Sequence, residues 1–404
     1  MSIVLQRPYQ FIPPHRGNFW PTLIQKFRVV DHYLRFKEGV RSFECRNLEL
    51  FERALCDDRG ILLTPNHCRY ADPLVMGWPA RLASAHVYAM ASWHLFNKSW
   101  LDRFAMRKMG AFSINRESAD RQSLETAIDI LSRGERPLIL FPEGTTSRMN
   151  DDVKELLDGV TFIARSAARR SVKNQGKAIV MLPVAIKYLC REDCKDWVIE
   201  HSIALENHLG QTKSSNESLP KRVIHLVEMW LALQERLVFG KSQQGPVGER
   251  RVRLVDELLL RLEDQLSIKN EVADQKVSSR IRVIRSEIVN RRFSDPSTNV
   301  ESLRAMSESA MLCQELATYD DRYLTSDQVS DIRLVETIQR LQESCFGKAK
   351  QNFPLHAVID FGEPIDVPAS KAPRGKQDPL LEVLETTLKS MIQNLSSEAK
   401  LVSA

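Results

Sequence analysis

A histidine and an aspartate stand five residues apart just after a short apolar run. The segment is Asn66-His67-Cys-Arg-Tyr-Ala-Asp72-Pro73, and the run before it is Ile61–Leu63. At this spacing Asp72 can hold one imidazole nitrogen of His67, which leaves the other nitrogen basic enough to take a proton from an alcohol. Alone, the pair favours a structural or surface histidine, because the spacing arises easily by chance.

A second motif, Gly110-Ala-Phe-Ser-Ile-Asn-Arg116, ends a strand-like run in a fixed positive charge. The planar guanidinium of Arg116 offers paired donors that suit phosphate oxygens. The alternative for Arg116 is an ordinary surface ion pair at the end of a strand.

The third motif is Phe-Pro-Glu143-Gly144-Thr145-Thr-Ser-Arg148, which follows a buried-strand pattern. Gly144 permits a close approach of the backbone, the hydroxyls offer donors, Glu143 is an acceptor and Arg148 adds positive charge. A strand-to-helix turn with a capping hydroxyl is the alternative.

The fourth motif is a buried-strand pattern, residues 179–187, with Pro183 near its middle. Proline has no N–H to donate to a central ladder. We therefore expect Pro183 to lie at a special turn or at an edge.

In this order, the four motifs resemble the glycerolipid acyltransferase superfamily, whose members acylate glycerol-3-phosphate, lysophosphatidate and related lysolipids. The resemblance covers about residues 60–190 and extends to the strand-turn at 355–365. The His-x4-Asp and Phe-Pro-Glu-Gly motifs are specific, and the arginine and proline motifs are less so. The resemblance implies an α/β fold, with a mixed, largely parallel sheet flanked by helices.

The resemblance also implies acyl transfer without a covalent enzyme intermediate and without a cofactor. His67, oriented by Asp72, would be the general base for the free hydroxyl of 1-acyl-glycerol-3-phosphate, which attacks the thioester of acyl-CoA or acyl carrier protein. The substrate-binding residues implied are Arg116 for the acceptor phosphate, Glu143, Gly144, Thr145 and Arg148 for the acceptor site, and Pro183 for the acyl-donor end.

One position departs from the family pattern. Many members that use lysophosphatidate carry Arg directly after the Gly-Thr of the third motif, and this chain has Thr146 there. Arg148, two residues later, is the candidate replacement. The acceptor therefore stays open, with lysophosphatidate first and glycerol-3-phosphate or another lysophospholipid second. Cys68, beside the base, would be a thiol nucleophile that such a family does not need.

A second hypothesis is a non-catalytic lipid-binding scaffold that kept the fold. The intact pair of His67 and Asp72 favours the enzyme, because a binding protein needs no base at that position. A role with nucleic acid has no recognition motif behind it.

Strand-like and helix-like stretches alternate through the segment that carries the motifs, which predicts an α/β unit with a largely parallel sheet. The predicted strands are 61–63, 85–89, 111–114, 138–141 and 179–186, and the predicted helices are 123–131 and 152–168. After a long interruption, a strand at Leu355–Phe361 and a helix at about Pro379–Leu395 return to the same pattern. We expect that strand to join the same sheet.

The chain divides into an N-terminal arm with an amphipathic helix (1–59), a discontinuous α/β domain (60–190 and 353–404) and a helical insertion (191–352). Within the insertion, similar segments begin at Arg222, Arg251 and Arg280, 29 residues apart. Each unit predicts one amphipathic helix of about 17 residues plus a connection. The insertion is a candidate surface for a protein partner.

Composition is that of an ordinary folded protein: 404 residues, 43% hydrophobic, 27% charged and a net charge of +5. The longest apolar stretch, 178–186, is far below the ~18–20 residues of a spanning helix, and the N-terminus lacks an apolar signal core. Scattered cysteines favour reduced thiols, and Cys190 with Cys194 has the wrong spacing for zinc. We expect a cytoplasmic protein, peripheral at the inner face of the membrane.

Two basic stretches are candidates for membrane contact. The first is a single helix at residues 19–37, whose apolar residues recur every three or four positions. The second is the group Arg165, Arg169, Arg170 and Lys173. A basic amphipathic helix can lie in a membrane interface, and packing against the core is the alternative.

Overall fold

A computed structural model describes residues 3–210, 217–268, 276–295, 297–319, 322–325, 329–373 and 375–402. Its main sheet has the strand order β1-β8-β6-β2-β5-β3-β4, with β9 also paired to β6. The strands are β1 (Val40–Arg46), β2 (Gly60–Pro65), β3 (Tyr88–Ser92), β4 (Ala111–Ile114), β5 (Leu138–Ile139), β6 (Ile179–Cys190), β8 (Leu355–Phe361) and β9 (Ile365–Asp366). Only β8 and β9 meet β6 antiparallel. The predicted mixed, largely parallel sheet is confirmed.

The late strand β8 lies inside this sheet, between β6 and β1. Its register with β6 runs from Leu355 opposite Cys190 to Phe361 opposite Val184, and β6 pairs in turn with β2. The predicted return of the chain to the sheet is confirmed. The independence of the parts as domains stays a prediction.

Both faces of the sheet are buried, as the continuous apolar strands require. On β2, Leu62 enters one core while Ile61 and Leu63 enter the other. The first core is closed by α7 (Arg121–Arg133), α8 (Gly159–Lys173) and α16 (Pro379–Ser396), and the second by α2 (Val29–Lys37), α3 (Leu48–Cys56), α4 (Asp72–Val75) and α5 (Gly77–Leu82).

Three predicted elements differ in the structure. Residues 19–37 form two helices, α1 (Phe19–Lys26) and α2, because Arg28 adopts a left-handed φ of 50° between them. Strand β1 lies in the segment that we expected to be an arm, and it pairs in parallel with β8. The helix expected from residue 152 begins only at Gly159, because the N–H of Lys154 instead binds the side chain of Glu143.

Pro183 lies in the middle of β6, opposite Thr64 of β2, so the expected turn or edge is wrong. Its carbonyl accepts the N–H of Gly362, in the connection between β8 and β9. The N–H and C=O of one strand residue point to the same side of the strand. The missing N–H of Pro183 would therefore point toward the β8–β9 connection, and not toward β2. The ladder with β2 therefore loses no hydrogen bond.

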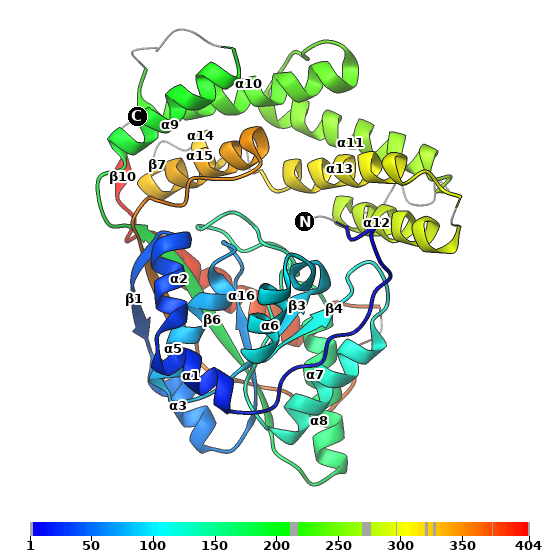
Figure 1. The fold of residues 1–404 in the computed structure, drawn as a ribbon. Helices are drawn as coiled ribbons and strands as arrows, with labels where there is room; N and C mark the ends of the chain where they lie inside the picture. The colour runs from blue at the N-terminus through cyan, green and yellow to red at the C-terminus, as the bar shows by residue number, and fades with distance from the viewer. Residues whose placement is uncertain are drawn as a thin grey trace.

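Between β6 and β8 the chain forms the helical region, defined here as α9 to α15. Its elements are α9 (Lys195–His208), α10 (Leu219–Phe239), α11 (Val247–Gln265), α12 (Val277–Ser294), α13 (Val300–Leu316), α14 (Arg322–Thr325), β7 (Val329–Ser330) and α15 (Asp331–Phe346). Figure 1 shows it lying over the sheet, on the side where β6 leads into α9. β7 pairs with β10 (Leu401–Val402), near the C-terminus.

The predicted repeat corresponds to α10, α11 and α12, which have 21, 19 and 18 residues. A buried ion pair joins each helix to the preceding one: Arg222 to Glu206, Arg250 to Glu235, and Arg280 to Glu263. In the second of these pairs the arginine is Arg250, and not Arg251, which occupies the repeat position in the sequence. The segments 240–246 and 295–299, which join these helices to their neighbours, are mainly loops, with residue 296 outside the described residues.

Candidate active site

His67 and Asp72 form a buried pair at the carboxyl end of β2. The distance from Nδ1 of His67 to Oδ2 of Asp72 is 2.9 Å. The same oxygen accepts the N–H of Arg69 at 2.8 Å. Because an ionised carboxylate only accepts, Nδ1 carries the proton and Nε2 is left as the basic nitrogen. The expected contact between His67 and Asp72 is present, and their catalytic role stays a prediction.

Tyr188 of β6 is a site residue that the motifs did not reveal. Its hydroxyl donates to Oδ1 of Asp72 at 2.6 Å, so both oxygens of this fully buried carboxylate are engaged. Burial, and then the charge of Asp72, raise the pKa of Tyr188 well above its usual value, which keeps the phenol a donor. The sequence did hold one signal for Tyr188, namely a tyrosine within a strand that is otherwise apolar. A phenol buried there needs a hydrogen-bond partner.

The third motif forms a loop that hydrogen-bonds both the N–H and the carbonyl of His67. The N–H of His67 donates to Oε1 of Glu143 at 2.6 Å, and the N–H of Ser147 donates to the carbonyl of His67 at 2.6 Å. Burial raises the pKa of Glu143 to about 8. Gly144 has a φ of 69°, and a Cβ there would meet Leu157 at 2.3 Å. Glu143 therefore holds the dyad loop, defined here as residues 66–72 after β2, rather than opening toward a substrate.

Thr146, in the same loop, lies against the basic nitrogen of the dyad. Its Oγ1 is 3.1 Å from Nε2 of His67, and its side chain is buried. The ring of Phe141 covers the imidazole with a centroid distance of 4.2 Å. Thr145, next to it, is half-buried. The position where the sequence departs from the family pattern is thus in contact with His67.

Arg148 is bound to the helical region. Its Nη2 lies 2.7 Å from Oε1 of Glu343 on α15, and its guanidinium stacks over Tyr70 at 4.7 Å. Its charge is therefore neutralised by a protein carboxylate. This contact disfavours Arg148 as the replacement for the arginine that the motif lacks.

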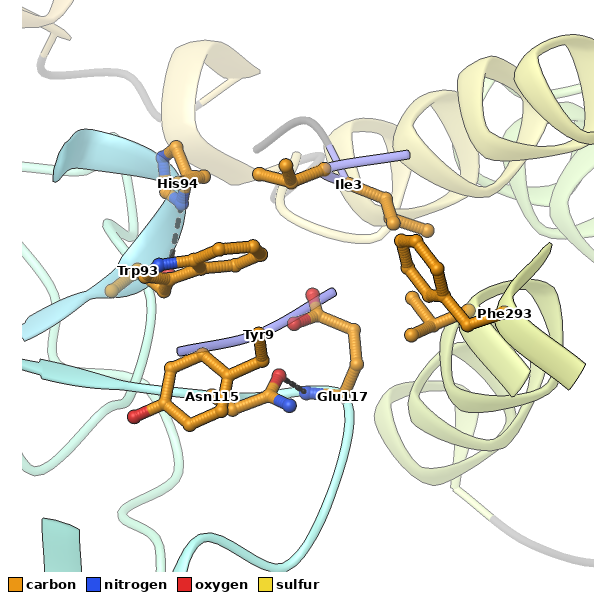
Figure 2. Close-up of a pocket in the computed structure, with 10 residues that line it drawn as sticks. Ile3, Tyr9, Trp93, His94, Asn115, Glu117 and Phe293 are labelled. Atoms are coloured by element: carbon orange, nitrogen blue, oxygen red, sulfur yellow. Dashed lines mark hydrogen bonds between the residues drawn. The ribbon is translucent and has the colours of Figure 1, made fainter. Parts of the chain in front are cut away.

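Arg116 follows β4, three strands from β2 at the same edge of the sheet. Burial lowers its pKa to about 10, Glu117 opposes this change, and Arg285 of α12 adds to it. A pocket beside Arg116 is lined by residues that include His94, Asn115 and Glu117 (Figure 2). Burial, and then the charge of Arg116, lower the pKa of His94 to about 3, so His94 is neutral. Arg285 in turn pairs with Glu117, so the charged groups described beside Arg116 include a second arginine and one carboxylate.

Comparison with known proteins identifies the segment that contains these motifs. Residues 42–187 match the family model described as Acyltransferase. These residues are an acyltransferase domain. They run from β1 into β6, so they include the dyad, the third-motif loop and Arg116.

Two curated proteins named 1-acyl-sn-glycerol-3-phosphate acyltransferase are distant homologues. The Bacillus subtilis (strain 168) protein is 28% identical over 129 residues, which are 32% of this chain and 58% of that protein. The Streptococcus pneumoniae (strain ATCC BAA-255 / R6) protein is 32% identical over 114 residues, which are 28% of this chain and 40% of that protein. The chain thus covers less than two thirds of either relative.

Helix α15, which lies outside the matched segment, contacts the acyltransferase domain through polar side chains. Arg69, within the dyad loop, donates to Oε1 of Gln339 at 2.9 Å and lies 3.6 Å from Glu336. The N–H of Asn150, just after the third motif, lies 3.3 Å from the other oxygen of Glu336. Sequence motifs could not predict these contacts, because α15 follows the dyad by more than 250 residues.

Cys68, the cysteine next to His67, does not supply an activated thiol. Sγ of Cys68 lies 3.7 Å from the carbonyl of Ile186 and 3.9 Å from Asp72, and burial raises the pKa of the thiol well above its usual value. Near α9, burial likewise raises the pKa of Cys190 and of Cys194. In the described ranges, no cluster of three His, Cys, Asp or Glu side chains could hold a metal ion.

Proposed function

We propose that the protein transfers a fatty acyl group from an acyl thioester to the free hydroxyl of 1-acyl-glycerol-3-phosphate. The observation that carries the proposal is the arrangement of His67, with Nδ1 on Asp72 and Nε2 against a hydroxyl. The names of the two homologues support the choice of acceptor.

In this mechanism the acceptor hydroxyl replaces that of Thr146 at Nε2 of His67. The imidazole takes the proton as the hydroxyl oxygen attacks the thioester carbonyl, and Asp72 stabilises the imidazolium that forms. The C–S bond then breaks, and the leaving thiolate receives the proton. Acyl-CoA or acyl carrier protein is the co-substrate, and neither a covalent intermediate nor another cofactor takes part.

Arg116 is the proposed partner of the acceptor phosphate. The planar guanidinium of Arg116 suits phosphate oxygens, and Arg116 follows β4 at the same edge of the sheet as His67. Arg148 and Glu143 are engaged with other protein groups, so their proposed contribution is to hold the site in shape. Gly144 and Thr145 form the wall of the loop next to the base.

We also propose that helices α1, α2 and α6 (Trp100–Lys108) contact the membrane surface from the cytoplasmic side. Aromatic side chains are exposed there: Phe19, Phe27, Tyr33, Phe36, Trp100 and Phe104. Trp20 of α1 packs edge-on against Phe104, and Lys108 lies over the Trp20 ring. A face that mixes aromatic and basic side chains suits a lipid interface.

Arg165 does not belong to a membrane-contacting surface, because it is buried in a two-bond ion pair with Asp378. Arg169 donates to Ser166, and Arg170 pairs with Glu125. Among the described residues, no helix combines the length and apolarity needed to cross a bilayer. Sedimentation with anionic liposomes at low salt, and release at high salt, would support the peripheral contact.

An acyltransfer assay tests the function. Labelled acyl-CoA is offered with glycerol-3-phosphate, lysophosphatidate or lysophosphatidylcholine, and we expect the highest kcat/KM with lysophosphatidate. His67→Ala should lose at least about 100-fold in rate. The matched control is His225→Ala, at a histidine on α10 whose side chain is 48% exposed. No transfer by the unmodified protein to any acceptor would favour the non-catalytic scaffold.

A further inference from the structure

Thr146, His67 and Asp72 form a hydrogen-bonded series, in which the proposed transfer uses His67 and Asp72 but gives the hydroxyl of Thr146 no chemical role. The distances are 3.1 Å from Oγ1 of Thr146 to Nε2 of His67, and 2.9 Å from Nδ1 of His67 to Oδ2 of Asp72. A hydroxyl, an imidazole and a carboxylate in this order make an activated nucleophile in acyl-transfer enzymes. With Nδ1 donating to Asp72, the hydroxyl of Thr146 donates to the basic nitrogen.

The position of Thr146 is fixed by the chain on both sides of it. Glu143 receives the N–H of His67, and the N–H of Ser147 binds the carbonyl of the same histidine. Thr146 itself is only 7% exposed. The contact between Oγ1 and Nε2 is therefore built into the loop, and is not one rotamer of a mobile surface side chain.

The neighbouring nucleophiles have other partners. The hydroxyl of Ser147 exchanges hydrogen bonds with the backbone of Met149. The thiol of Cys68 lies toward Ile186, and burial keeps it protonated. In the described part of the chain, the N–H groups of Thr145 and Thr146 make no hydrogen bond to another backbone carbonyl.

We propose that Thr146 is itself an acyl acceptor when a thioester donor binds without a lipid acceptor. Oγ1 attacks the thioester carbonyl, the O–C bond forms, and the C–S bond breaks. The hydroxyl proton passes through Nε2 of His67 to the leaving thiolate, which departs as the free thiol. The product is an acyl ester on Thr146.

Hydrolysis of that ester completes a slow thioester hydrolase activity. Water gives its proton to His67 and attacks the ester carbonyl, which releases the fatty acid and restores the hydroxyl of Thr146. A lipid acceptor prevents both steps by taking the place of Thr146 at Nε2. The inference uses the dyad and the thioester donor of the proposed function, and it adds an activity to them.

The test uses the full chain and palmitoyl-CoA alone, with intact mass and thiol release as readouts. We expect one acyl group per chain, mapped to the third-motif loop and stable to neutral hydroxylamine, which cleaves cysteine thioesters but not this ester. Thr146→Val should lose the adduct, and its thiol release should fall at least about 100-fold. Thr146→Ser should keep the adduct.

Controls separate this inference from the proposed function. Thr126→Val is the matched control, because that α7 hydroxyl bonds only a carbonyl of its own helix in the described residues, and it should keep the adduct. An adduct that persists in Thr146→Val would overturn the inference. Transfer to lysophosphatidate without any adduct on the unmodified protein would also overturn it, while leaving the function intact. An adduct without transfer to any lipid would instead overturn the function alone.

Discussion

The hydroxyl of Tyr188 lies 2.6 Å from Oδ1 of Asp72, and this bond ties the dyad to the neighbouring strand. The other oxygen of Asp72 receives His67 and the N–H of Arg69. A fully buried carboxylate stays charged only when such donors surround it. We therefore propose that Tyr188, supplied by β6 rather than by the His-x4-Asp motif, positions the proposed base.

Tyr188→Phe should change the pH profile of acyl transfer as well as its rate. Removing a hydrogen bond to a charged group costs about 1.5–3 kcal/mol. Asp72 then holds the proton on His67 more firmly, so the acidic limb of kcat/KM against pH should move to higher pH. The profile is measured with lysophosphatidate in excess. A lower rate with no shift of the acidic limb would mean that the phenol contributes packing alone.

Arg116→Ala should raise KM for the phosphate-bearing acceptor and leave KM for acyl-CoA nearly unchanged. A charge-assisted bond of about 1.5–3 kcal/mol corresponds to about 10–150-fold. Arg133→Ala is the control, at an arginine of α7 whose side chain is 59% exposed. Equal changes in both KM values would contradict phosphate binding by Arg116.

The raised pKa of Glu143 predicts that the free energy of unfolding depends on pH. Burial raises its pKa from an ordinary 4.5 to about 8 in the folded protein. Its protonated form is thus the one that the fold favours, and its contribution to stability is lost as pH rises from about 4.5 through 8. Glu143→Gln cannot ionise, so its Tm relative to that of the unmodified protein should rise between pH 5 and pH 8. A Tm difference independent of pH would show that Glu143 stays ionised throughout this range.

The buried ion pairs of the helical region should be costly to break. Arg280 and Glu263 are each about 6% exposed and share two hydrogen bonds. Arg280→Ala leaves a buried carboxylate alone and should cost about 3–5 kcal/mol in denaturant unfolding. Arg261→Ala, which removes an exposed pair with Glu257, should cost at most about 0.5 kcal/mol. Equal small losses would mean that water reaches Glu263.

Sequence patterns predicted the parts of the site that are local in the chain. The spacing of His67 and Asp72 sets their contact, and alternating apolar runs placed β2, β4 and β6. The contacts from β6 and α15 to the dyad loop join residues more than 100 positions apart, and no local period encodes them. The break at Arg28 was also missed, because apolar spacing continues across it while the backbone turns.

Truncation after Gln351 should unfold the acyltransferase domain, although the cut is far in sequence from the dyad. It would remove β8, which is the partner of β1 and of β6. It would also remove α16, whose leucines Leu384 and Leu388 are fully buried against the sheet. Burial of such a side chain is worth about 1.5–3 kcal/mol, so the loss of several exceeds the stability of a typical domain. Circular dichroism and the transfer assay on residues 1–351 measure the effect. A folded, active 1–351 chain would show that β2 and β6 hold the site without their neighbour.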